Sequence, residues 1–394
     1  MAIRDRNFRK NLLLVAVLAL ITVSIFYLQS QKTKVNSGAI DRTLEQQDND
    51  PNNQSAQAKA ENTGKGTVKN LAYPRAPEFA GIERWINSEP LKMEQLRGKV
   101  VLIDFWTYSC INCIRTLPYL KAWDKKYKDK GLVIIGVHSP EFEFEKKYEN
   151  VLSAVNKYQI EYPVAQDNEF VVWQLYKNLY WPHKFLIDQD GYIRYNHIGE
   201  GNYDETEKQI QQLLKERMER LNEKSELSEE LSRPKEAVES SFRSIGTPEI
   251  YMGYQFTRGN FGNEEGYKAD KIVHYEMPNK INENDVYLNG DWKNNADNVE
   301  LASDYGEVVL KFKAKSLNIV AGSDSKTKAT IFLDDKTVDS TNKGTDVIIQ
   351  GNTGFAEFQE YKLYNLVDSG NYNSRTIKMK VSGKGFKLFT FTFG

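Results

Sequence analysis

The chain of 394 residues contains only two cysteines and four histidines, and its charges almost cancel. Two cysteines cannot form the several disulfides that hold together a small, cross-linked secreted scaffold. The 53 lysines and arginines are balanced by 54 aspartates and glutamates, so no overall positive field attracts nucleic acid, and we assign no nucleic-acid partner. The chain is also longer than one hydrophobic core usually supports, which predicts at least two domains.

The longest uncharged run lies near the N-terminus. Basic side chains from Arg4 to Lys10 precede the segment NLLLVAVLALITVSIFYL, which carries no charge. About eighteen residues at roughly 1.5 Å each just cross a hydrocarbon core of about 30 Å, and no small-residue cleavage signal follows. We therefore predict a retained signal anchor over residues 1–30. The basic flank predicts a single-pass protein of the cell membrane, with its N-terminus cytoplasmic and the rest extracytoplasmic.

Composition divides the remainder into four segments. Residues 31–72 are rich in Asn, Gln, Ser and Asp and predict a flexible linker. Strand-like and helix-like stretches alternate over residues 73–220, which predicts an α/β domain with a central mixed sheet flanked by helices. Residues 221–243 are charged on every side and predict a solvated connector. Short alternating segments over residues 244–394 predict an all-β sandwich of the jelly-roll kind.

Within the α/β segment, VVLIDFW and GLVIIGVHSP are apolar runs of strand length on either side of the helical pattern IRTLPYLKAWDKKYKDK. A strand, a helix and a second strand in this order predict parallel pairing of the two strands. Further helices are expected over residues 144–158, 169–178 and 203–219. Asp190-Gly191 between HKFLID and IRYNHIG predicts an antiparallel hairpin.

Cys110 and Cys113 are separated by two residues, and this spacing fits half of a metal site, a small structural staple or a redox pair. Zinc needs about four ligands, and the four histidines are scattered. A disulfide that closes so short a loop adds little stability. In the redox interpretation Cys110 lies where a helix begins, and the helix N-terminus stabilises its thiolate as the nucleophile. Cys113 then resolves the mixed disulfide.

The segment VVLIDFWTYSCINCIRTLP resembles the active-site segment of the thioredoxin superfamily. Together with GVHSPEFEFE and YWPHKFLID it is similar to the DipZ-type exported thioredoxin-like proteins, a TlpA-like branch of the redoxin group that includes cytochrome c maturation factors. The segments TPEIYMGY, LNGDW and FTFG resemble the C-terminal β-domain of this family, which is likened to a carbohydrate-binding module. The resemblance implies a thioredoxin fold over residues 73–220.

The resemblance also implies roles for single residues. Pro182 matches the cis-proline that faces the cysteines, and Trp181 before it would present its peptide group to the substrate chain. We also place Trp106 and Ser109 among the substrate-contacting residues. Thioredoxin itself has a tryptophan where this chain has Ser109, and "IN" here separates the cysteines, so the direction of electron flow stays open.

Asp104 is an acid inside an otherwise apolar strand, and burial is expected to raise its pKa. The resemblance implies that Asp104 is the acid or base for Cys113. The alternative is a strand-end acid that is hydrogen-bonded to a helix amide.

Three further residues carry weaker signals. Thr107 precedes Cys110 by three residues, as in peroxiredoxins, and keeps a thiol-dependent peroxidase open. His138 is expected to orient a loop, whereas His183, next to Pro182, could approach the disulfide and favour the thiolate.

Aromatic residues of the C-terminal segment could form a platform for sugar rings, or could simply be core. They are Tyr251, Tyr254, Phe256, Phe261, Tyr267 and Trp292.

These observations predict a membrane-anchored, extracytoplasmic thiol-disulfide oxidoreductase whose redox-active Cys110–Cys113 disulfide needs no metal or organic cofactor. Expected partners are exported proteins with disulfides, a separate integral-membrane thiol electron donor, and cell-envelope glycan bound by the C-terminal domain. The alternatives are a peroxidase and a glycan-binding protein with an accessory redox domain.

Overall fold

The computed structural model describes residues 73–238 and 244–394, all of which belong to one compact unit, Thr67–Gly394. The predicted anchor over residues 1–30 and the linker over residues 31–72 lie outside the described residues. Within the described residues, no helix combines the length and the apolar character needed to cross a membrane.

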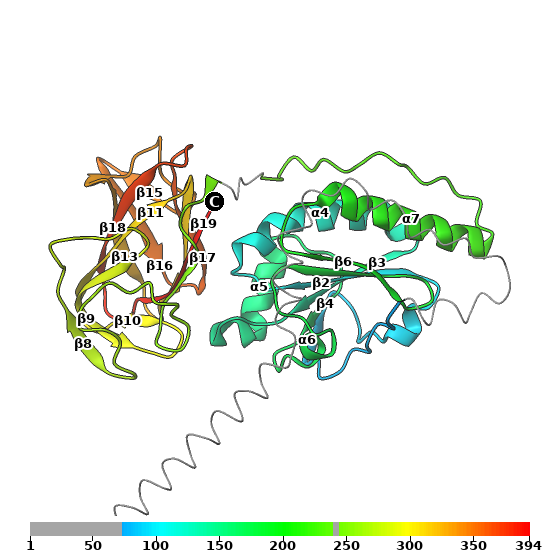
Figure 1. Cartoon of the computed structure of the whole chain (residues 1–394), viewed down its shortest axis with the longest axis horizontal. Coiled ribbons are helices and arrows are strands. Elements are labelled where there is room, and N and C mark those ends of the chain that lie inside the picture. Colours follow the sequence, from blue (N-terminus) through cyan, green and yellow to red (C-terminus); the bar gives the residue numbers. More distant parts are fainter. Residues whose placement is uncertain (1–72, 239–243) are drawn as a thin grey trace, which may run out of the picture. The chain divides into compact units, whose positions relative to one another are not determined.

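The N-terminal domain is built on a six-stranded mixed sheet with helices on both faces (Figure 1). Its strand order is β1-β4-β3-β2-β5-β6, in which β2, β3 and β4 run parallel and the other pairings are antiparallel. The strands are β1 (Arg84–Ile86), β2 (Val100–Trp106), β3 (Leu132–His138), β4 (Val164–Gln166), β5 (His183–Ile187) and β6 (Ile193–Ile198). The predicted parallel pair and the predicted hairpin are both confirmed.

The central strand β2 is buried on both faces, as its apolar sequence predicts. Val100, Leu102 and Trp106 belong to one hydrophobic cluster with α4, α5 and α7, whereas Ile103 and Phe105 belong to another with α6. Because side chains alternate along a strand, Asp104 points to the face that α4 covers. Figure 1 shows α4 and α7 on one side of the sheet and α6 on the other.

The helices differ from the sequence prediction mainly in length. They are α4 (Ile111–Tyr127), α5 (Tyr148–Lys157), α6 (Val171–Leu175) and α7 (Tyr203–Leu221), with 3-10 turns η1 (Met93–Leu96), η2 (Lys128–Lys130) and η3 (Glu143–Lys146). The helix expected over residues 144–158 is broken at Lys147, which has extended backbone angles. The helix expected over residues 169–178 is reduced to the five residues of α6.

The C-terminal domain consists of strands. They are β7 (Ile250–Tyr251), β8 (Ile272–Tyr275), β9 (Val286–Asn294), β10 (Val299–Leu301), β11 (Tyr305–Lys313), β12 (Ser316–Gly322), β13 (Thr327–Leu333), β14 (Lys336–Thr337), β15 (Ile348–Gln350), β16 (Thr353–Phe358), β17 (Lys362–Asp368), β18 (Ser374–Ser382) and β19 (Lys387–Phe393). The all-β prediction is confirmed.

The two layers expected of a sandwich are joined through one strand. The first half of β9 pairs with β11, and its second half pairs with β8 and β10, so hydrogen bonding continues through thirteen strands. Gly290 lies at the change of partners with a φ of +98°, a conformation that glycine adopts without strain. The prediction of a jelly-roll sandwich is therefore corrected to a single sheet that folds over one core.

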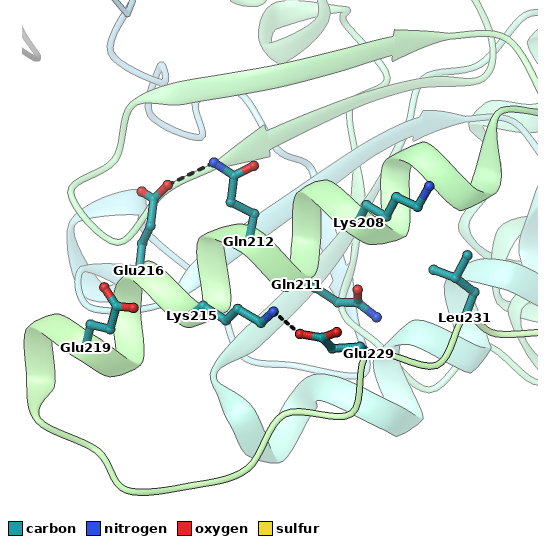
Figure 2. A pocket seen from close by; sticks show the side chains of 8 residues that line it. All are labelled: Lys208, Gln211, Gln212, Lys215, Glu216, Glu219, Glu229 and Leu231. Carbon is teal, nitrogen blue, oxygen red and sulfur yellow. Dashed lines mark hydrogen bonds and ion pairs between the residues drawn. The ribbon is translucent and has the colours of Figure 1, made fainter. Parts of the chain in front are cut away.

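The described part of the charged connector is not simply solvated but follows α7 (Figure 2). The Gln211 side chain donates a hydrogen bond to the Ser228 carbonyl, and Ser232 donates to Glu207 through both its amide and its hydroxyl. A hollow of about 580 Å³ lies between α7 and the connector, bordered largely by charged and amide side chains and an ion pair of Lys215 with Glu229. None of the predicted site residues lines it.

Candidate active site

The two cysteines lie at the N-terminus of α4, directly after β2. Cys110 is the N-cap residue, and its Sγ accepts a hydrogen bond from the Cys113 amide at 3.3 Å. Cys110 is half-buried and Cys113 is 1% exposed, and both are free thiols. Cys110 is therefore the more accessible of the two residues, while Cys113 is enclosed.

The thiolate prediction for Cys110 needs correction. Burial raises the pKa of Cys110, and the negative charges of Glu249 and Glu141 raise it further. The hydrogen bond from the Cys113 amide lowers the pKa but does not outweigh burial. Burial raises the pKa of Cys113 much further. The helix N-terminus alone therefore does not produce an acidic thiol, although the order of the two sulfurs still favours Cys110 as the nucleophile.

Ser109 and Trp106 are buried, which contradicts their prediction as substrate contacts. Trp106 is 0% exposed, and its indole ring lies edge-on to His138. The Ser109 hydroxyl donates to Oε1 of the fully buried Glu145 at 2.5 Å, and Oε2 of Glu145 accepts from the Glu141 and Phe142 amides. These bonds tie the residue before Cys110 to the turn after β3. Glu145 gave no recognisable signal in the sequence.

Asp104 lies on the face of β2 that α4 covers, and its charge adds to the rise in the pKa of Cys113. Burial raises the pKa of Asp104 itself to about 7, although Lys184 lowers it. The predicted elevation is confirmed. The alternative, a hydrogen bond to a helix amide, is not observed for Oδ1, which has no hydrogen-bond partner among the described residues.

Pro182 follows a cis peptide bond, in agreement with the resemblance. The register pairs Phe105 with His183, so Pro182 lies at the end of the sheet where β2 passes into the cysteine loop. Trp181 is half-buried and is held by a hydrogen bond from its Nε1 to the Ser139 carbonyl at 3.0 Å. The role of Trp181 in contacting a substrate chain stays a prediction.

The alternative in which His183 approaches the disulfide is not what the structure shows, because its ring lies between Asn178 and Asn196. Its Nδ1 lies 2.7 Å from the Asn178 side chain and its Nε2 lies 3.2 Å from the Asn196 side chain, and burial lowers its pKa to about 4. His138 is 0% exposed, and burial lowers its pKa to about 3. Its Nε2 lies 3.5 Å from the Thr107 hydroxyl, in agreement with a loop-orienting role.

Acidic groups that the sequence analysis did not single out lie near Cys110. The Tyr251 hydroxyl of β7 donates to Oε1 of Glu141 at 2.7 Å and lies 3.4 Å from Oε2 of Glu249. Burial, together with Glu145, raises the pKa of Glu141 to about 8. Because Tyr251 and Glu141 are more than one hundred positions apart in sequence, local pattern could not reveal the group.

Replacing Glu141 with glutamine is expected to lower the pKa of Cys110. Cys110 titrates above its ordinary range, where Glu141 is ionised and opposes the thiolate, so removal of this charge favours the thiolate. The measurement is the pH dependence of Cys110 alkylation by iodoacetamide in a Cys113→Ser background. Glu143→Gln, an exposed glutamate of the same turn, is the control. An unchanged or higher Cys110 pKa would contradict the prediction.

Of the two alternatives for the C-terminal aromatics, core packing holds for Trp292, and the other five aromatics are half-buried. Trp292 is 0% exposed, while Phe261 and Tyr267 stack on one another and pack against the core. Phe256 packs beside Phe142 of the N-terminal domain. Among the six aromatics, Tyr254 pairs with an acid at the surface, Asp270.

Among residues 73–238 and 244–394, no three His, Cys, Asp or Glu side chains are grouped as a metal ion would require. The chemistry that this site can perform therefore follows from its two sulfurs and from the ionisable groups around them.

Two family models match the two domains. Residues 74–196 match the AhpC/TSA family, and residues 247–394 match the family described as "Thioredoxin like C-terminal domain". A thiol:disulfide interchange protein DsbE, described as putative, from Chlorobium tepidum is 27% identical with a TM-score of 0.32, covering 36% of this chain and 96% of its own.

Curated relatives extend the likeness. Protein DipZ of Mycobacterium tuberculosis is 32% identical over 342 residues, which are 86% of this chain but 45% of DipZ. This chain thus spans less than half the length of that relative. The thiol-disulfide oxidoreductase ResA of Bacillus cereus is 30% identical over 138 residues, which are 35% of this chain and 76% of ResA. With the β2–α4 cysteine pair and the mixed sheet, these matches show that the chain belongs to the thioredoxin-like thiol-disulfide oxidoreductase family, and that it resembles DipZ in both domains.

Proposed function

We propose that this protein reduces disulfides of exported proteins while tethered to the outer face of the cell membrane by its N-terminal segment. The observation that carries the proposal is the position of Cys110 as the half-exposed N-cap of α4, with its Sγ bonded to the amide of the buried Cys113. This arrangement separates a sulfur that meets the substrate from one that resolves the product.

The proposed cycle needs two exchange steps. The Cys110 thiolate attacks one sulfur of a substrate disulfide, which forms a mixed disulfide and releases the other substrate sulfur as a thiolate. Cys113 then gives its proton to Asp104 and attacks Cys110 Sγ. The Cys110–Cys113 disulfide forms, and the substrate leaves reduced by two electrons in total.

The partners follow from this cycle as proposals. A separate integral-membrane thiol carrier would return two electrons to the Cys110–Cys113 disulfide, and the substrates would include apocytochromes and other exported disulfide proteins. The C-terminal domain would hold the redox domain at cell-envelope glycan. The alternative of a glycan-binding protein with an accessory redox domain predicts glycan retention that is unchanged when both cysteines are replaced.

The test is the reduction potential of the Cys110–Cys113 couple in the full chain, equilibrated against dithiothreitol or glutathione buffers. We expect a value near or below about −250 mV, as for thioredoxin, which makes the protein a reductant. A value near about −120 mV, as for DsbA, would make it an oxidant of exported thiols and would reverse the proposed direction.

A thiol-dependent peroxidase is the second candidate, because residues 74–196 match the AhpC/TSA family and Thr107 stands three residues before Cys110. Against it, Thr107 is fully buried and its hydroxyl faces His138. A peroxidase would consume peroxide through Cys110, and the variants in the Discussion separate the two activities.

A further inference from the structure

The hydrophobic cluster behind the cysteines continues from the N-terminal, redox domain into the C-terminal domain. Besides Trp106 and Cys113, this cluster contains Val320 of β12, Leu363 of β17 and Phe389 of β19. A sequence neighbour of each of these three belongs to the separate core of the C-terminal domain, so their side chains point to the opposite face of its sheet. The two domains are therefore joined by apolar packing, and parting them would expose this surface to water.

The turn after β3 forms the redox side of this contact. Its buried Phe142 and Phe144 rings lie 5.2 Å and 4.8 Å from the ring of Phe389, measured between centroids. The Phe144 ring also stacks on Tyr361 at 5.3 Å, with 28° between the two planes. The same turn carries Glu145, whose carboxylate binds the hydroxyl of the residue before the nucleophile. The C-terminal domain thus packs on the turn that restrains the cysteine loop.

Tyr361 also contacts the cysteine loop directly. Its carbonyl accepts a hydrogen bond at 3.3 Å from the hydroxyl of Tyr108, two residues before Cys110. The Tyr361 side chain is fixed within its own domain, because its hydroxyl donates to Asp324 at 2.8 Å. A side chain at Gly322 would collide with the Tyr361 ring, so the absence of a Cβ there leaves the space that this ring needs. The ring therefore has a defined place between the two domains.

A second contact from the C-terminal domain lies on the acidic side of Cys110. The Tyr251 hydroxyl, which donates to Glu141, also lies 3.4 Å from Oε2 of Glu249. Burial is the main cause of the raised pKa of Cys110, and the negative charge of Glu249 raises it further. Because β7 pairs with β19, Glu249 holds this position only while the sheet is docked on the redox domain.

The titratable groups that act on Cys110 come from both domains. They are Cys113 on α4, Glu141 in the turn after β3, and Glu249 and Tyr251 of the C-terminal domain. Two arginines oppose the acids: Arg258, whose guanidinium lies 4.8 Å from the centre of the Tyr251 ring, and Arg115 on α4 both lower the pKa of Glu249. The C-terminal domain therefore contributes both burial and charge to the surroundings of the nucleophile.

We propose that Tyr361 is a positioning residue of the redox centre, through which the docked C-terminal domain shields Cys110, brings Glu249 beside it and so slows the reaction of its thiol. This role rests on the proposed function, and it gives the C-terminal domain a part in the redox step. In that step Cys110 gives its proton to water, its thiolate attacks one sulfur of the substrate disulfide, and the other sulfur leaves as a thiolate. The docked domain disfavours the first event, because it keeps water from the thiolate and places a carboxylate near it.

The test is the pH profile of Cys110 alkylation by iodoacetamide in the full chain with Cys113→Ser. The thiolate displaces iodide, so the rate follows the fraction of Cys110 that is ionised. We expect Tyr361→Ala to speed alkylation severalfold at pH 7 and to move the profile to lower pH. Tyr361→Phe keeps the ring and the carbonyl and should retain the original profile. Tyr305→Ala, which removes an exposed tyrosine of β11, is the control and should change nothing.

The charge of Glu249 gives a second measurement. Glu249→Gln should speed alkylation of Cys110 at pH 7 when Tyr361 is present, because it removes a negative charge that opposes the thiolate. In a Tyr361→Ala background the same substitution should have much less effect, because the carboxylate is no longer held beside Cys110. An effect of equal size in both backgrounds would overturn the role of Tyr361.

Loss of the contact is separated from unfolding by the buried cysteine. In a Cys110→Ser background, Tyr361→Ala should leave Cys113 as slow to react as before. Leu363→Ala removes another side chain of the contact and carries the same expectations for both cysteines, which guards against a defect peculiar to one variant.

An unmoved Cys110 profile in Tyr361→Ala and Leu363→Ala would overturn the proposal. Equal acceleration of Cys110 and Cys113 would also overturn it, because Tyr361 would then stabilise the whole fold instead of positioning the cysteine loop. Failure of the unmodified protein to reduce disulfides would contradict the proposed function instead, because alkylation reports on Cys110 whether or not a substrate is reduced.

Discussion

Replacing Cys113 with serine is expected to stop the reaction at the mixed disulfide, with the substrate protein covalently bound to Cys110. Cys113 is 1% exposed, one helical turn from Cys110, and its amide already contacts Cys110 Sγ. An intramolecular thiol held in this way acts at an effective concentration that no external thiol reaches, so turnover should fall at least about 10³-fold. The measurement is the rate of disulfide reduction, together with the appearance of adducts that dithiothreitol releases.

Cys110→Ser provides the matched control, because it removes the sulfur of the half-buried residue and leaves that of the fully buried one. It should abolish turnover and capture no protein, since Cys113 has almost no surface to offer. Equal capture by the two variants would show that the assignment of nucleophile and resolving cysteine is wrong. Peroxide consumption that survives Cys113→Ser in the presence of an external thiol would favour the peroxidase over the reductase.

Local sequence was enough to locate the cysteine pair within the fold. An apolar strand, a Cys-x-x-Cys and a helical pattern specify the β2–α4 junction, because strand length, capping and periodicity are properties of neighbouring residues. The same holds for the hairpin at Asp190-Gly191, where the turn residues determine the pairing. Asp104 was identified because an acid inside an apolar strand is conspicuous in any sequence.

The groups that determine the pKa values of the site could not be identified from local sequence. Lys184 acts on Asp104 because two strands far apart in the sequence lie side by side, and Tyr251 reaches Glu141 from another domain. Burial of Cys110, which outweighs the helix N-terminus, is likewise a result of tertiary packing. Trp292 shows the same limit, because the sequence pattern of an aromatic residue after a turn fits both a ligand platform at the surface and a side chain in the core.

Asp104→Asn is expected to slow the resolving step by about 10²-fold or more, the usual contribution of a positioned acid or base. Asparagine keeps the shape of the side chain but cannot accept the proton of Cys113. With Ellman's reagent, attack by Cys110 releases one thionitrobenzoate and attack by Cys113 on the mixed disulfide releases the second. The second phase should therefore lose the rise with pH that ionisation of Asp104 near pH 7 causes, whereas the first phase remains. A second phase of unchanged rate and pH dependence would show that Asp104 is not the base.

The same substitution should have the opposite effect on stability, and this effect depends on pH. The pKa of Asp104 is about 7 in the folded protein against 3.8 for the free side chain, so the folded state holds more protons between these values and loses stability as pH rises through them. A difference of about 3 units corresponds to no more than about 4 kcal/mol, and the loss is complete above about pH 7. The asparagine substitution removes this loss, but it also leaves the Lys184 ammonium without its nearest anion, which reduces the gain.

Asp104→Asn should therefore unfold at higher urea concentration than the unmodified protein near pH 8.5, with a much smaller difference or the reverse near pH 4.5. Tryptophan fluorescence reports chiefly on the N-terminal domain, because five of the six tryptophans lie before residue 220. Asp129→Asn, at an exposed acid in η2, is the control and should show no such pH dependence.

An Asp104→Asn protein that resolves the mixed disulfide more slowly, yet is more stable at alkaline pH, would mean that the fold keeps a destabilising carboxylate because the redox step needs it. Equal destabilisation at both pH values would instead show that Asp104 is a structural acid.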